Sequence, residues 1–165
     1  MAVYATGHYG MALLVYAPVG FLLLEVDPTL AFVGGAGVVA LATLPDIDMD
    51  LPLVPHRGPT HSLPFVALVA AVLGAAGWVV GQGSWQPLGP SARAALFAAG
   101  LGVIGVGSHL LADMLTPAGI NPFWPLPGDT ITFDIARADN TVANYALLGL
   151  GALAAAVALV LGGPG

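Results

Sequence analysis

The sequence predicts an all-α fold: an integral membrane helical bundle of about five transmembrane helices with a one-sided metal site. Of the 165 residues, 58% are hydrophobic and only 7% are charged, and the mean hydropathy is +0.91. A chain with so few charged side chains cannot build the mixed charged surface that keeps a soluble domain dispersed. We therefore expect one membrane-embedded domain over residues 1–165, surrounded by lipid.

Five apolar stretches account for the predicted helices, each near the roughly 20 residues that a helix needs to cross a bilayer. The first contains Pro18 and closes just before Pro28, which predicts a short, kinked or tilted helix. Glycines such as Gly74 and Gly77 would let neighbouring helices approach closely. Pro and Gly predict a turn at 82–91. The stretches lie at about 9–24, 29–45, 63–81, 92–112 and 144–162.

The predicted membrane crossings determine on which side of the membrane each polar segment lies. If the chain crosses at each stretch, the N-terminus, the 46–62 loop and the 113–143 loop emerge on one side, opposite the turn at 82–91 and the C-terminus. Arg57 and Arg137 then share the first side, against Arg93 on the other. By the positive-inside rule, this favours a cytoplasmic location for the first side, in the inner or plasma membrane.

Two features of the composition exclude other classes of site and partner. The chain has no cysteine, so disulfides and thiolate metal ligands are excluded, and imidazole and carboxylate remain as ligands. The net charge is -6 with no lysine, which argues against a nucleic-acid surface. The first ten residues lack Lys and Arg and hence the basic region of a signal peptide, so we expect the N-terminus to be retained.

All four histidines lie in or next to the segments that share one side, and acidic residues accompany them. A catalytic zinc takes three protein ligands and a water, so a larger set suits two divalent ions about 3.5–4 Å apart. The alternative is a single ion with outer carboxylates. Zinc is the metal expected first. The candidate ligands are His8, Asp46, Asp48, His56, His61, His109 and Asp113.

The spacing of two acidic motifs suggests how they could reach a metal. His109 and Asp113 are four residues apart on a predicted helix, so both can reach one ion, or one can orient the other. Asp46 and Asp48 alternate after Pro45, and in an extended backbone both could point at one ion. The alternative for this pair is a polar helix terminus.

The segment HRGPTHS supplies a candidate anion contact. If His61 opens the third helix, Thr60 or Ser62 can cap it, and the helix dipole favours an anionic ligand such as a phosphoryl group. Arg57 would then clamp the phosphate, although it could instead anchor to lipid headgroups. Asp48, Asp113 and Arg57 are the candidate catalytic residues.

At LPDID, HRGPTHSL and SHLLADMLTPAGI, and at Gly7 and His8, the sequence resembles the YdjM-type family of membrane-bound proteins assigned as metal-dependent hydrolases. The resemblance spans roughly residues 7–125. It implies a small multispanning protein, the same seven metal-site residues with Arg57 and Thr60 among them, and a distant likeness to zinc-dependent phospholipase C. Many relatives have a histidine where this chain has Met49, so either that histidine is dispensable or the site has one ligand fewer.

These observations predict a membrane-bound hydrolase that uses metal-activated water on phosphoesters in lipid headgroups or lipid-linked phosphates. Membrane lipid and the lipid or lipid-linked phosphate substrate are its expected partners. The alternatives are a metal-ion transporter or metal-sensing membrane protein without hydrolase activity, and a purely structural protein. A transporter is expected to hold its ligands near the bilayer midplane, whereas these residues lie toward one face.

Overall fold

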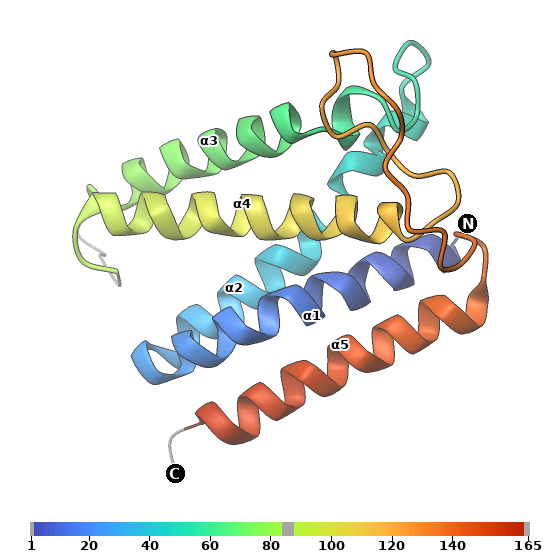
Figure 1. The fold of residues 1–165 in the computed structure, drawn as a ribbon. Coiled ribbons are helices and arrows are strands. Elements are labelled where there is room, and N and C mark those ends of the chain that lie inside the picture. Colours follow the sequence, from blue (N-terminus) through green and yellow to red (C-terminus); the bar gives the residue numbers. More distant parts are fainter. Residues whose placement is uncertain (1, 84–87, 164–165) are drawn as a thin grey trace.

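Helix formation follows from the apolar composition, because a backbone in lipid must satisfy its own hydrogen bonds. The computed structural model describes residues 2–83 and 88–163 and contains five α-helices: α1 (Ala2–Val26), α2 (Pro28–Leu41), α3 (Leu63–Val80), α4 (Ser91–Met114) and α5 (Thr141–Gly162) (Figure 1). Two short 3-10 helices, η1 (Leu44–Asp50) and η2 (Pro59–His61), lie between α2 and α3. Within the described residues there is no strand, only an isolated bridge between Ile120 and Ile131.

Five helices are long and apolar enough to cross a membrane, which confirms the predicted fold class. The boundary between the first two is where the sequence placed it: the Asp27 side chain caps α2 by accepting from the backbone N–H of Thr29, 2.7 Å away. The start of α1 differs from the prediction. The helix begins at Ala2 rather than near residue 9, so His8 lies within α1 and not before it. Residues 2–8 contain no proline to stop the helix from extending outward.

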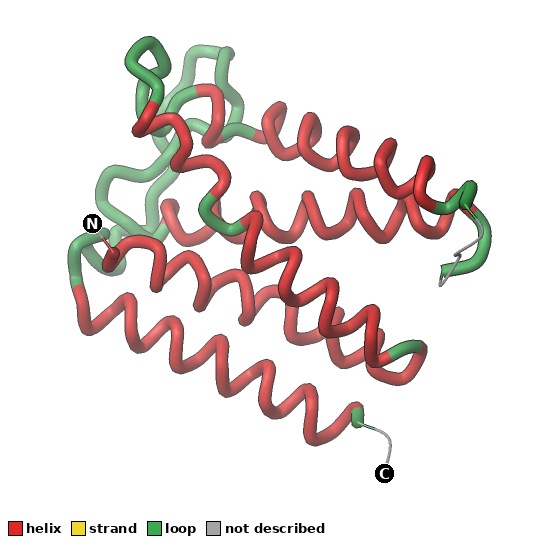
Figure 2. The backbone as a smooth tube through the Cα atoms, turned by 180° about the vertical axis from the view of Figure 1, so that it is seen from behind, coloured by secondary structure: helices red, strands yellow, loops and turns green. Residues whose placement is uncertain are grey.

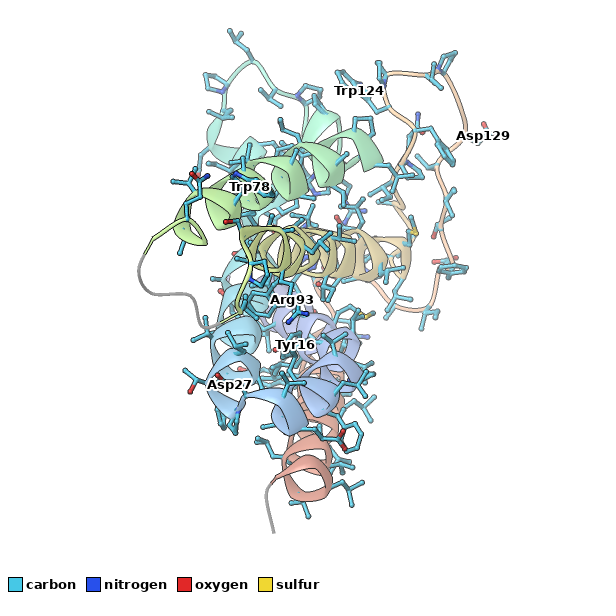
Figure 3. All side chains as sticks on the ribbon, turned by 90° about the vertical axis from the view of Figure 1, so that its left-hand side faces the viewer. Tyr16, Asp27, Trp78, Arg93, Trp124 and Asp129 are labelled. Atoms are coloured by element: carbon cyan, nitrogen blue, oxygen red, sulfur yellow. The ribbon has the colours of Figure 1, made fainter. Side chains whose placement is uncertain are left out.

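The helix α1 is the centre of the bundle, packed against α5, α2 and α4, whereas α3 packs on α4 at the edge (Figure 1). Close packing of α1 and α5 depends on glycine, because a Cβ added at Gly151 would lie 2.2 Å from the carbonyl oxygen of Gly10. Between α1 and α2 the buried Tyr16 hydroxyl donates to the carbonyl of Ala31 at 2.7 Å (Figure 3). The helices α4 and α5 both pack on α1 yet have almost no contact with each other.

The long polar segments gather at one end of the bundle, as the crossing order predicts. Figure 2 shows the loops between α2 and α3 and between α4 and α5 beside the N-terminus, with the C-terminus at the far end. The long loop after α4 folds back on that helix, where Phe133 N–H donates to the Met114 carbonyl at 2.7 Å and Ile135 N–H to that of Leu115 at 2.8 Å. Of the predicted turn at 82–91, residues 84–87 lie outside the described part of the chain.

Candidate metal centre

The seven predicted metal-site residues come together at the loop-bearing end of the bundle. His8 comes from α1, Asp46 and Asp48 from η1, His61 from η2, and His109 and Asp113 from the last turns of α4, while His56 lies in the loop before η2. They form three groups that could each hold a metal ion: His8, His109 and Asp113; Asp46, His61 and His109; and Asp48, His56 and His61. Hence the residues are clustered, but the three groups differ in geometry.

Four side-chain atoms converge on one point: Nε2 of His61, Nε2 of His109, Oδ2 of Asp113 and Oδ1 of Asp46. The two nitrogens are 3.1 Å apart. Oδ2 of Asp113 lies 3.1 Å from Nε2 of His61 and 3.3 Å from Nε2 of His109. Oδ1 of Asp46 lies 3.6 Å and 3.5 Å from the same two nitrogens. His61 and His109 are fully buried, so these atoms meet away from solvent.

These separations fit a tetrahedral metal site. Zinc binds imidazole nitrogen and carboxylate oxygen at roughly 2.0–2.2 Å. The edges of a tetrahedron with those radii are then roughly 3.3–3.6 Å long. Five of the edges between the four atoms measure 3.1–3.6 Å. The donor set therefore has the spacing of a four-coordinate ion.

The hydrogen bonds on the far side of each ring determine which nitrogen faces the centre with a lone pair. Nδ1 of His109 lies 2.7 Å from the carbonyl oxygen of Ala42, which only accepts, so Nδ1 carries the proton. Nδ1 of His61 faces Oδ2 of Asp48 at 3.1 Å and the Thr60 hydroxyl at 3.0 Å. That hydroxyl donates its proton to Asp48 at 2.6 Å, so toward His61 it can only accept.

When both rings are neutral, each therefore turns an unprotonated Nε2 toward the two carboxylates. Two lone pairs at 3.1 Å repel each other unless positive charge lies between them. Metal-ligating histidines are held in this way, by a carboxylate or backbone carbonyl that accepts from the other ring nitrogen. Oδ2 of Asp113 is buried and accepts no other hydrogen bond in the described structure, which leaves it for a cation.

The electrostatic surroundings of His61 favour a positive charge. Burial by itself lowers the pKa of this imidazole, but the nearby carboxylates of Asp113 and Asp46 outweigh it and raise the pKa to about 9. The negative potential that stabilises the imidazolium would equally stabilise a bound divalent cation, which competes with that proton for Nε2.

Asp48 lies behind His61 rather than at the convergence point. The sequence allowed an extended segment in which Asp46 and Asp48 point at one ion, but η1 is a 3-10 helix, and residues two apart on such a helix project in different directions. Asp46 therefore reaches Nε2 of His61, while Asp48 reaches Nδ1 of the same ring. Oδ1 of Asp48 accepts from Nδ1 of His56 at 2.8 Å, and Oδ2 also accepts from the backbone N–H of Arg57 at 3.2 Å.

Arg57 holds the other oxygen of Asp113. One terminal nitrogen of its guanidinium donates to Oδ1 of Asp113 at 2.9 Å. The other donates to the Thr116 hydroxyl at 2.9 Å and to the Gly119 carbonyl at 3.0 Å. The sequence suggested a phosphate clamp, yet both terminal nitrogens are occupied by the protein. The contact orients Asp113 so that Oδ2 faces the two imidazoles.

The helix N-terminus near His61 also differs in detail from its prediction. His61 ends η2 and does not belong to the first turn of α3. The sequence offered Thr60 or Ser62 as the cap of this helix. Ser62 caps α3 by accepting from the backbone N–H of Phe65 at 3.3 Å. Thr60 instead donates to Asp48, so its hydroxyl belongs to the support of His61.

His8 and His56 lie at the margins of the centre. The ring of His8 stacks on that of His109, with centroids 3.9 Å apart and planes at 14°. Because a ligand lone pair lies in the plane of its ring, stacked imidazoles do not both aim at one ion. Nδ1 of His8 is buried and has no hydrogen-bond partner in the described structure. The His56 side chain is 43% exposed and contacts Asp48.

Comparison with protein families supports the resemblance in the motifs. The family model for the YdjM inner membrane protein matches residues 4–163, nearly the whole chain. The chain belongs to the YdjM family. With its five apolar helices, this YdjM family member is a multi-pass inner membrane protein. Comparisons with curated proteins and with solved structures found no match.

This chain has Met49 where many relatives in the YdjM family have a histidine, and the structure shows where that position lies. The Met49 side chain is 60% exposed on η1, and the four converging atoms come together without a contribution from this position. Trp124, for which the sequence suggested an interfacial anchor or a lid, is 40% exposed on the loop after α4, and Asp129 projects outward from the same loop (Figure 3).

Several supporting groups of this YdjM chain had no recognisable signal in the sequence. The carbonyl of Ala42 holds His109, but a backbone oxygen leaves no mark in a sequence. Thr116 holds Arg57 from 59 residues away, and only its place in the motif SHLLADMLTPAGI could have suggested it. Asn144 anchors the long loop by donating to the carbonyl of Ala138 at 2.8 Å, and it packs against Gly7, where an added Cβ would overlap its side chain.

Proposed function

We propose that the protein binds a divalent metal ion, zinc, and uses it to hydrolyse phosphoesters in membrane lipids or lipid-linked phosphates. The observation that carries the proposal is the convergence of His61, His109, Asp46 and Asp113 at tetrahedral spacing, with Nδ1 of each imidazole held by the protein so that Nε2 is the nitrogen that a metal would use. Two nitrogens and two carboxylate oxygens in a tetrahedron are ligands that suit zinc, and the chain has no thiolate to compete.

One ion is proposed rather than two. The ring of His8 runs parallel to that of His109, and His56 is directed at Asp48 on the far side of His61. Neither histidine therefore completes a second set of atoms as closely spaced as the first. The metal stoichiometry of the purified protein tests this count directly.

The chemistry divides between the ion and the residues around it. When bound, zinc would supply Lewis acidity that lowers the pKa of a water and polarises a phosphoryl oxygen. Because the four residues already fill a tetrahedron, this chemistry would need the ion to expand to five ligands or to release one carboxylate. Asp48 and Ala42 hold the two imidazoles in the ligating tautomer, and Arg57 orients Asp113.

The position of the centre and its charged neighbours support a lipid phosphoester as substrate. His109 and Asp113 lie in the last turns of a membrane-spanning helix, at the depth where headgroups meet the hydrocarbon. Arg57 and Arg137, two of the three basic residues of the chain, line one cavity of about 230 Å³ beside Thr116. Asp139 pairs with Arg137 there, so the positive charge of that cavity is partly balanced.

The experiment combines metal analysis with hydrolysis. The purified protein, reconstituted in phosphatidylcholine vesicles containing phosphatidic acid, phosphatidylglycerol or a prenyl diphosphate, is assayed for release of phosphate or headgroup with zinc, manganese or magnesium. We expect one ion per chain and metal-dependent release from at least one lipid, and we expect His109→Ala to lose both. Asp50→Asn, an exposed position on η1, is the matched control that should keep both.

The same vesicles separate the proposal from the transporter alternative. Bound metal without cleavage of any lipid, together with zinc uptake into the vesicles that His109→Ala abolishes, would replace hydrolysis by transport. A protein that binds no divalent ion after purification and reconstitution would remove the metal centre itself.

A further inference from the structure

A cavity opens beside the metal centre because α4 and α5 both pack on α1 but hardly touch each other. Its volume is about 210 Å³. Gly7 and His8 on α1 form part of its wall, and Asp113 on α4 reaches it from the centre. The remaining lining comes from the ends of α4 and α5 and from the loop segment 135–138. The cavity is therefore continuous with the proposed reaction site.

Away from that junction the walls of the cavity are apolar except for Asn144 and Arg137. On α5, residues at helical spacing line it: Ala143, Ala146, Leu147 and Leu150. Ala146 is exposed and Leu150 is 56% exposed, although both belong to a helix that spans the membrane. The rim along α5 therefore faces lipid, so the cavity is reached from the side of the bundle as well as from the headgroup region.

The polar end of the cavity is lined by a histidine that has a ring nitrogen without a hydrogen-bond partner in the described structure. His8 is only 7% exposed, and its Nδ1 accepts and donates no hydrogen bond within the described structure. A buried polar atom without a partner is unfavourable, so this end of the cavity suits a polar group better than an apolar one. A molecule that presents a polar group at this end and an apolar tail along α5 would match both parts of the wall.

We infer that this cavity is the chain-binding subsite of the substrate: an alkyl chain of a membrane lipid enters sideways between α4 and α5 and brings the lipid's polar group to the end of the cavity that His8 and Asp113 line. This inference rests on the proposed function, because the bound lipid is a substrate only if the protein hydrolyses lipids. Binding of the alkyl chain itself does not depend on catalysis. The subsite gives α5, which contributes no candidate ligand, a role in selecting lipids over water-soluble phosphoesters.

The test measures occupancy without turnover. Phosphatidic acid carrying a photoactivatable diazirine in its acyl chain is incorporated into phosphatidylcholine vesicles with the reconstituted protein and irradiated, and the labelled peptides are identified by mass spectrometry. We expect labelling of α5 around Ala146 and Leu147. Ala146→Phe should fill the cavity and lose most of that labelling, whereas Ala156→Phe, at an exposed alanine of the same helix that lines no described cavity, should keep it.

Metal content and soluble substrate separate the possible failures. Ala146→Phe should keep the wild-type metal content and the wild-type hydrolysis of a water-soluble phosphoester, while losing hydrolysis of the long-chain lipid. If Ala146→Phe alters folding, judged by metal content, Ala143→Leu fills the inner part of the same cavity instead. Equal labelling of α5 in the filled variants and the wild type overturns the subsite. Specific labelling without hydrolysis of any phosphoester overturns the proposed function and leaves the lipid site.

Discussion

Substitution of Asp48 tests whether metal affinity depends on residues that support the ligands without contributing a ligand atom. Its carboxylate accepts three hydrogen bonds, from Nδ1 of His56, the backbone N–H of Arg57 and the hydroxyl of Thr60, and its Oδ2 lies 3.1 Å from Nδ1 of His61. In Asp48→Asn the amide oxygen can take the place of Oδ2 and keep three of these contacts. The amide nitrogen then faces His56, which is 43% exposed and free to turn. What is lost is the negative charge behind His61.

The structure therefore predicts a graded effect on metal affinity. Loss of an outer partner of a metal-binding histidine typically weakens metal binding by about 10–100-fold. We expect Asp48→Asn near the lower bound, because most contacts survive, and Asp48→Ala near the upper bound, because all four contacts are lost. These factors correspond to about 1.4–2.7 kcal/mol of binding free energy. His61→Ala, which removes a ligand atom, should weaken binding more than either.

The affinity is measured by competition with a fluorescent zinc chelator on detergent-purified protein, with helix content checked by circular dichroism. Asp50→Asn serves as the control, because it removes an exposed carboxylate from the same 3-10 helix. Wild-type affinity in both Asp48 variants would refute the supporting role. A loss in Asp48→Asn as large as that in His61→Ala would instead make Asp48 a direct ligand.

Three other predictions concern packing, linkage and topology. Gly151→Ala should cost about 1–3 kcal/mol of stability by overpacking α1 against α5, measured by thermal unfolding, whereas Gly149→Ala, with nothing within 4 Å of the added methyl, should cost nothing; equal effects would contradict the close approach. Chelation should lower wild-type stability by about 2.7 kcal/mol relative to free zinc at a hundred times its Kd, and an equal change in His61→Ala would show that the ion acts elsewhere. Because the chain has no cysteine, single cysteines at Leu53 and Gln82 can be labelled cleanly and should react with an impermeant thiol reagent from opposite sides of the membrane; labelling of both from one side would reject the five-helix crossing order.

The helices and the gathering of the site could be predicted from the sequence because both depend on local composition. In lipid an apolar run has no stable alternative to a helix, so the five stretches correspond to α1, α2 continued by η1, α3, α4 and α5. Crossing order then places the polar segments at one end, and a spacing of four on a helix brings His109 and Asp113 to one face. Hydropathy does not predict the start of α1, because the helix extends to Ala2, beyond the N-terminal end of the apolar stretch. His8 therefore lies inside the helix although the apolar stretch begins after it.

The role of each residue within the site was decided by tertiary structure alone. Asp46 and Asp48 are alike in sequence, yet one faces Nε2 of His61 and the other Nδ1, because a 3-10 helix turns them in different directions around the ring. The sequence around Arg57 also fits a contact to phosphate. Its actual partners, Asp113 and Thr116, lie more than 50 residues away in the chain. Local pattern fixes what a segment becomes and which side of the membrane it reaches. Which atoms meet within 4 Å depends on how separate helices pack, and no local pattern records that.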